Sequence, residues 1–186
     1  MDTKTKGMVM SGMLVLSILL GILAVTGMSW VTADEEGVEA NYGLSEGELT
    51  MDLFGTKTTL EVEWSDACDD AKDMDMEDDD SCDVATAGTI GTIGLWLGIV
   101  MAAVFAAMLI LPMAGVDAME NMPDLAQKII SWGAGGVMLL GIIGWMIMMP
   151  ELESEMGYGM SFFMAMFAGL LALGTQLMDI FVPADE

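Results

Sequence analysis

The chain has 186 residues, 54% of them hydrophobic, and a net charge of −24 from 29 acidic and five basic side chains. It has no His, and the basic residues are all Lys. Haem ligation by His, zinc hydrolase chemistry and Ser–His catalysis are therefore excluded within this chain, as is bidentate phosphate binding by Arg. The electrostatic field of such a strongly negative chain repels nucleic acid and attracts cations or basic partners.

Four long stretches contain no Asp, Glu, Lys or Arg: residues 7–31, 86–113, 129–149 and 156–178. About 20 apolar residues, at about 1.5 Å rise each, cross a hydrocarbon core of roughly 30 Å, so each stretch predicts a transmembrane helix. The first stretch follows two lysines, as in a signal peptide. It is longer than the roughly 7–15 residues of a signal-peptide core and has no clean cleavage site, so we expect an uncleaved helix.

Basic residues near the ends of these stretches predict the orientation in the membrane. Lys4, Lys6 and Lys128 lie beside predicted helix ends, and such residues favour the cytoplasmic side. We therefore expect a multi-pass protein of the cell membrane with both termini in the cytoplasm. The cytoplasmic segments are then residues 1–6, 114–128 and 179–186, and the external ones are an acidic loop, 32–85, and a short loop, 150–155.

The acidic loop contains both cysteines, Cys68 and Cys82. A pair confined to the outer face is typical of a disulfide in an oxidising compartment. The alternative is a reactive or metal-binding pair, which the 13 intervening residues and the lack of His disfavour. The loop also holds 19 acidic residues and two Lys, a net charge of −17. That charge serves either solubility or the recognition of cations or a basic protein.

Alternation of apolar and polar residues predicts a half-buried β-hairpin in this loop. Gly55 and Thr56 separate the two alternating runs, and Gly at the first central position suits a type II′ turn; residues 38–44 suit a further strand. A lone hairpin is marginal in water, so a third strand, the disulfide or the helices must support it. The expected apolar core of this domain is Trp30, Leu49, Met51, Leu53, Leu60, Val62 and Trp64.

The most acidic part of the loop, residues 65–83, follows the hairpin. Read from Asp73, it lacks the sixth-position Gly and the twelfth-position Glu of an EF-hand loop. We therefore expect no cofactor, and either a solvated acidic loop or a weak cation site. Two Met lie among these acids, and Met thioethers can bind Cu(I), but without His they make only a weak case for a copper site. The carboxylates available for a weak site are Asp73, Asp75, Glu77, Asp78, Asp79 and Asp80.

Small residues recur at four-residue spacing in the later stretches, and such residues let helix backbones approach closely. The pattern predicts packing within one bundle, with packing against a second copy as the alternative. Intramembrane charge, the usual mark of transport, is missing from all four stretches. The packing positions we expect are Gly94, Gly98, Gly136, Gly141, Ala165 and Gly169.

Trp30 follows the first stretch, and Trp64, Cys68 and Cys82 follow one another after the predicted hairpin. Together with four spans, this arrangement resembles the claudin and peripheral-myelin-protein superfamily, or a convergence on its topology. The resemblance implies cytoplasmic termini, a small antiparallel sheet in the first external loop and a disulfide between the two cysteines. The chain departs from that family at Val62-Glu63, where the family has Gly-Leu, and in its wider cysteine spacing.

The sequence thus predicts a transmembrane four-helix bundle with a small extracellular antiparallel β domain. We expect a non-enzymatic protein that acts in adhesion, in scaffolding or as an auxiliary subunit through residues 32–85. Expected partners are the lipid bilayer, further copies or a larger membrane complex, and cations or a basic protein, but no nucleic acid. The alternative is an oligomeric cation-selective channel, in which Thr89, Thr92 and Ser161 line a path between subunits.

Overall fold

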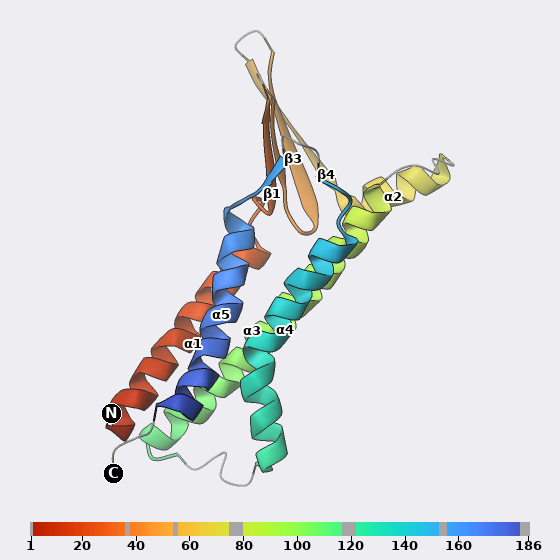
Figure 1. Ribbon diagram of the computed structural model, residues 1–186. Coiled ribbons are helices and arrows are strands. Elements are labelled where there is room, and N and C mark those ends of the chain that lie inside the picture. Colours follow the sequence, from red (N-terminus) through yellow and green to blue (C-terminus); the bar gives the residue numbers. More distant parts are fainter. Residues whose placement is uncertain are drawn as a thin grey trace. The chain divides into compact units, whose positions relative to one another are not determined.

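The computed structural model describes residues 2–35, 38–53, 56–74, 80–116, 122–152 and 156–182. Four long helices pack as a bundle, and a five-stranded antiparallel sheet is built mainly from the segment between the first two of them. The elements can be followed by colour in Figure 1. In chain order they are α1 (Thr3–Val25), β1 (Val31–Glu35), β2 (Val38–Tyr42), β3 (Glu46–Leu53), β4 (Thr56–Glu63), α2 (Trp64–Asp73), α3 (Ser81–Met113), α4 (Asp124–Met148), β5 (Met156–Tyr158) and α5 (Met160–Phe181).

The four long helices, α1, α3, α4 and α5, correspond to the four uncharged stretches and confirm the predicted fold class. Their most apolar parts have a mean hydropathy of 1.6 to 2.5, yet only 33% to 44% of those residues are buried within the protein. Large apolar side chains are exposed on them, including Leu140 at 67% and Ile147 at 73%. A helix with an apolar outer surface requires hydrocarbon around it. The chain is therefore an integral membrane protein with four spans.

The helix bounds differ from the predicted spans where other forces act at the ends. α3 and α4 each begin five residues before the uncharged stretch, and Asp83 and Asp124 lie in their first turns. Carboxylates there interact favourably with the helix dipole, so these helices extend beyond their apolar parts. α1 ends at Val25, because Val31 pairs in β1 instead of continuing the helix.

The strand order is β4-β3-β2-β1-β5, and every neighbouring pair is antiparallel. β2 confirms the strand expected within residues 38–44, and β3 with β4 confirms the hairpin. Leu53 pairs with Thr56, so Thr56 belongs to β4 and not, as had been predicted, to the turn; residues 54 and 55 lie outside the described residues.

Two strands, β1 and β5, were not predicted, because each is short and directly follows or precedes a long helix. β1 pairs with β5, and Val31 lies opposite Tyr158. The first three residues of the stretch 156–178 therefore form a strand, and α5 begins only at Met160. Hydropathy does not separate three strand residues from the helix that follows, because only the partner strand defines them.

The chain divides into two compact units, each containing part of every long helix. The first consists of Met1–Ile22, Gly94–Leu140 and Ala165–Glu186, and the second of Leu23–Ile93 and Gly141–Met164. The first unit has a buried apolar core and two polar links between α1 and α5. Ser17 Oγ donates to the carbonyl of Ala168 at 2.6 Å, and Lys6 Nζ lies 3.0 Å from both Asp179 Oδ1 and the Asp179 carbonyl. Lys6 thereby satisfies a carbonyl in the last turn of α5, which has no partner within the helix.

Candidate interaction surface

The second unit carries the sheet, and a cluster of aromatic rings fixes the start of β1 to its helices. Trp30 is fully buried, and its ring centroid lies 5.0 Å from Trp145 and 6.2 Å from Phe162. Its indole Nε1 donates to the Ala24 carbonyl at 2.8 Å, in the last turn of α1. Edge-to-face rings with a satisfied indole N–H form a rigid contact. The sheet is therefore a firmly held part of this unit.

A second Trp joins β4 to the first helix of the acidic segment. Trp64 begins α2 directly after the last residue of β4, Glu63. Its ring stacks on Tyr42 at 5.5 Å with an interplanar angle of 8°, and its Nε1 donates to the Gly43 carbonyl at 3.2 Å. The ring lies over Gly47, where a Cβ atom would overlap it. Gly47 thus makes the room in which Trp64 covers the end of the hairpin.

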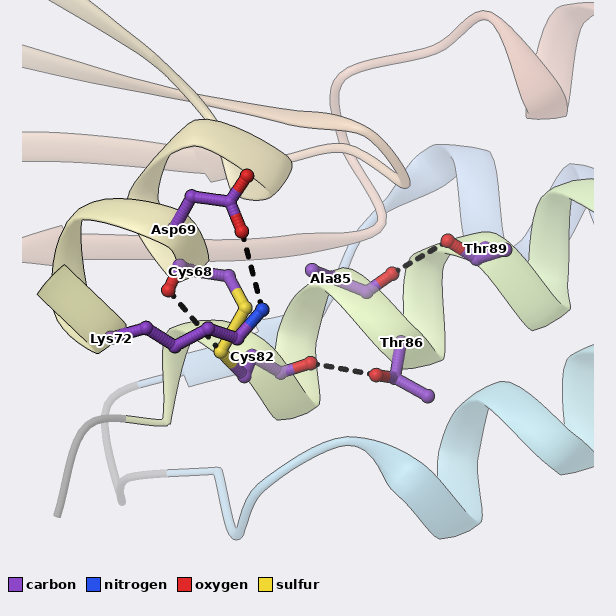
Figure 2. The surroundings of a disulfide bond; sticks show 7 residues. All are labelled: Cys68, Asp69, Lys72, Cys82, Ala85, Thr86 and Thr89. Atoms are coloured by element: carbon purple, nitrogen blue, oxygen red, sulfur yellow. Dashed lines mark hydrogen bonds and ion pairs between the residues drawn. A yellow bond between two sulfur atoms is a disulfide. The ribbon is translucent and has the colours of Figure 1, made fainter. Parts of the chain in front are cut away.

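The predicted disulfide is confirmed, and Figure 2 shows that it ties α2 to the start of α3. Cys68 and Cys82 are bonded, their Cα atoms are 4.5 Å apart, and the chain has no free cysteine. The alternative of a reactive or metal-binding pair is therefore wrong. Lys72 and Asp69 form an exposed pair one turn along α2 at 3.2 Å. Because α2 has only ten residues, it needs this cross-link and its packing to remain helical.

One face of the sheet is apolar and hollowed. A hollow of about 190 Å³ lies over β2, β3 and β4, and Leu60 on the outer strand is 53% exposed. Leu49 and Leu60 are direct cross-strand partners, so their side chains point to the same face. The residues that line the hollow are Ala40, Tyr42, Gly47, Glu48, Leu49, Leu60, Val62 and Trp64.

The other face of the sheet is acidic, and its carboxylates oppose one another. Glu46 lies opposite Glu63, and Glu48 lies opposite Glu61. Like charges at directly opposed positions destabilise a sheet. The ion pair between Lys57 and Glu39, at 3.7 Å, is exposed on both sides, and such a pair contributes only about 0–1 kcal/mol. This face therefore carries a largely uncompensated negative charge.

The residues proposed for a pore have different surroundings. Thr89 and Thr92 line a hollow of about 300 Å³ beside α2, and the exposed Thr89 Oγ1 donates to the Ala85 carbonyl at 2.9 Å (Figure 2). Ser161, in contrast, is 3% exposed and packs against Gly27. The three hydroxyls do not share one exposed face.

The carboxylates proposed for a weak cation site are only partly described. Asp73 ends α2, and Asp80 is exposed just before α3. Asp75, Glu77, Asp78 and Asp79 lie outside the described residues, so this site stays a prediction. Within the described ranges, no group of three or more His, Cys, Asp or Glu is placed to hold a metal ion.

The expected core positions of the loop domain differ in burial. Trp30 is fully buried, and Leu49, Met51, Val62 and Trp64 are half-buried. Leu60 is exposed because β4 is the edge strand and only β3 covers it. The backbone of Leu53 pairs with Thr56, but the burial of its side chain is not among the described features.

The expected packing positions lie on three helices, and the structure separates them by their neighbours. Gly94, Gly98, Gly141, Ala165 and Gly169 are buried. A Cβ atom on Gly169 would lie 2.7 Å from Leu139 Cδ2, and Gly98 packs against Met138 and Ala134.

Gly136 has no heavy atom within 4 Å of the place where a Cβ would stand. The residue that meets the neighbouring helix is Gly135, which was not among the expected positions. A Cβ there would lie 2.6 Å from the Gly169 carbonyl oxygen and from the Leu173 amide nitrogen. These two adjacent glycines differ in their surroundings only because one faces α5 and the other does not.

Comparison with known proteins identifies no family. No family model matches the chain, and no curated protein matches it. The likeness to claudins therefore consists of topology: four long apolar helices, an antiparallel sheet after the first of them and a disulfide.

Proposed function

We propose that this protein is a non-enzymatic membrane protein that binds a basic partner protein through the sheet, in adhesion, in scaffolding or as an auxiliary subunit. In this proposal residues 32–85 face the outside, both termini are cytoplasmic, and the fold is claudin-like in topology. The observation that supports it best is the sheet with two unlike faces that meet at the exposed edge strand β4.

The energetics of β4 favour such a partner. Glu61 and Glu63 oppose two further glutamates, an arrangement that weakens the isolated sheet. A basic surface against this strand would remove that repulsion and cover Leu60 on the other face. Burial of a Leu side chain is worth roughly 1.5–3 kcal/mol, so one partner that covers the edge strand gains from both faces.

An enzymatic role is not proposed because the chain has no His and no Arg, and its spans contain no ionisable residue in their apolar parts. The remaining alternative is an oligomeric cation channel. The acidic loop and the exposed Thr89 support it, whereas the burial of Ser161 removes one of its three pore residues.

A photo-reactive residue at position 60, in native membranes, tests the proposal. We expect it to crosslink to a partner with a basic surface. The yield should fall at least about fivefold when Glu46, Glu48, Glu61 and Glu63 are all changed to Gln, and also in about 1 M salt, where charges are screened beyond about 3 Å. The matched control is a photo-reactive residue at position 140, on an exposed part of α4, whose products should not respond to the Gln changes or to salt.

A yield at position 60 that is indifferent to both treatments would contradict the proposal. Cation flux into liposomes that contain only the purified protein tests the channel alternative. If the protein is not a channel, we expect no flux above that of empty liposomes. Reproducible single-channel currents would overturn the docking function in favour of a pore.

A further inference from the structure

An open cleft of about 520 Å³ lies in the first unit between the end of α3, the start of α4 and the end of α5. Its apolar lining residues are Phe105, Met108, Leu109, Trp132 and Ile180. Its other lining residues carry charged, amide or hydroxyl side chains. A cleft lined by both kinds suits an amphiphile better than a soluble metabolite or a purely apolar molecule.

A buried amide in this cleft has no partner. Gln176 is only 8% exposed and lines the cleft, but its side chain makes no hydrogen bond to any of the described residues. The amide atoms of Gln176 reach the open cleft, so this side chain is free to bind a polar group from outside the chain.

Two exposed residues of opposite charge line the same cleft. Asp124 and Lys128 are four residues apart on α4, so they lie on the same helix face, and both line the cleft. Neither forms an ion pair with another described residue. Asp179 lines the cleft as well, but Lys6 Nζ holds its Oδ1 at 3.0 Å.

The other polar side chains of the cleft are already engaged. Ser131 Oγ donates to the Lys128 carbonyl at 3.2 Å, and Gln127 Nε2 donates to the Met122 carbonyl at 3.1 Å. The groups left for a ligand are one ammonium, one carboxylate and one amide, contributed by Lys128, Asp124 and Gln176.

The position of these groups along α4 matches the interface of a bilayer. Asp124 is the first residue of this span, and Lys128 directly precedes its uncharged part. Trp132, one turn further, is 45% exposed, as is typical of aromatic residues at the level of lipid headgroups. The charged residues of α4 in the cleft therefore lie at the level of lipid headgroups, whereas Phe105 of α3 lies within an uncharged stretch.

We propose that this cleft binds one phospholipid with an aminoalkyl headgroup of the phosphatidylethanolamine type. Its phosphate accepts hydrogen bonds from the Lys128 ammonium and the Gln176 amide, and its ammonium donates to the Asp124 carboxylate. An acyl chain lies against Phe105 and Met108. Because Lys128 is balanced by Asp124, and Lys6 by Asp179, the cleft favours a zwitterionic headgroup over an anionic one in a chain of net charge −24.

Native mass spectrometry of the detergent-purified protein, titrated with defined lipids, tests this assignment. The probes are dioleoyl phosphatidylethanolamine, dioleoyl phosphatidylglycerol, dioleoylglycerol and the soluble headgroup glycerophosphoethanolamine. We expect half-maximal retention of phosphatidylethanolamine at about five- to tenfold lower concentration than of the other two lipids, as for one or two charged contacts. The soluble headgroup should not be retained at these concentrations, because it buries no acyl chain.

Three variants assign the contacts. Lys128→Gln and Asp124→Asn should each weaken retention of phosphatidylethanolamine about fivefold, and Gln176→Leu, which keeps the volume and removes the amide, about threefold. The matched controls Lys57→Gln and Glu61→Gln change the net charge equally on exposed residues of the sheet and should leave retention unchanged. Addition of the lipid should raise the Tm of the wild type more than that of Lys128→Gln, and this comparison also verifies that the variant folds.

Equal retention of all three lipids would overturn the proposal, because the apolar lining residues alone would then account for binding. So would retention by Lys128→Gln and Asp124→Asn equal to that of the two controls. Tight binding of glycerophosphoethanolamine alone would assign the cleft to a soluble ligand instead of a lipid.

Discussion

Two adjacent glycines of α4 illustrate how the fold depends on single residues. Gly135 faces the α5 backbone at Gly169 and Leu173, whereas Gly136 faces open space. Both belong to a segment of small residues, and small residues in spans predict close helix contacts. The sequence-based prediction named Gly136 and not Gly135, because the sequence carries no information about which helix is nearest to which side of α4.

At this scale we predict that Gly135→Ala destabilises the protein and Gly136→Ala does not. The Cβ of the first variant must displace the α5 backbone, and overpacking of that kind costs about 1–3 kcal/mol. The second variant gains helix propensity of up to about 1 kcal/mol at no steric cost. Thermal unfolding in detergent of the two purified variants provides the measurement, and equal losses of stability would contradict the assigned packing.

At the scale of elements, the edge of the sheet is destabilised by its own charge. β3 and β4 form a regular hairpin of eight residues each, but two of their cross-strand pairs are Glu opposite Glu. Next to the turn, Asp52 opposite Lys57 has the usual arrangement of opposite signs. The alternation of apolar residues predicted the hairpin, since a strand buries every second side chain. The unfavourable pairs became visible only when the register was known.

We therefore predict that Glu61→Lys stabilises the hairpin. The new Lys faces Glu48 and replaces a repulsive pair by an attractive one, a change of about 0.5–1 kcal/mol. Hydrogen exchange of the β3 and β4 amides should slow by about two- to fivefold at low salt, and the gain should shrink as salt screens the pair. Thr59→Lys, which introduces the same residue opposite Thr50, is the control; if it slowed exchange equally, the pair with Glu48 would not be the cause.

At the scale of the whole molecule, the proposed function requires both termini on one side of the membrane and residues 32–85 on the other. The lysines near the helix ends predict which side is cytoplasmic. Both native cysteines are in the disulfide, so a single introduced cysteine reports its own side of the membrane.

We predict that Thr59→Cys reacts with a membrane-impermeant maleimide on intact cells and that Thr3→Cys reacts only after permeabilisation. Both side chains are exposed in the structure, so access to the reagent is limited by the membrane alone. Labelling of position 3 and not of position 59 on intact cells would reverse the proposed orientation.

The sequence by itself determined the four spans, the hairpin and the disulfide. Each of these depends on a local rule: the thickness of hydrocarbon, the two-residue period of a strand, or the presence of two cysteines in one loop. The pairing of β1 with β5, the contacts of Trp30 with Trp145 and Phe162, and the choice of Gly135 over Gly136 were decided by tertiary structure. The same is true of the cleft around Gln176. Each of these brings together side chains from distant parts of the chain, and hydropathy and spacing describe only what is near in sequence.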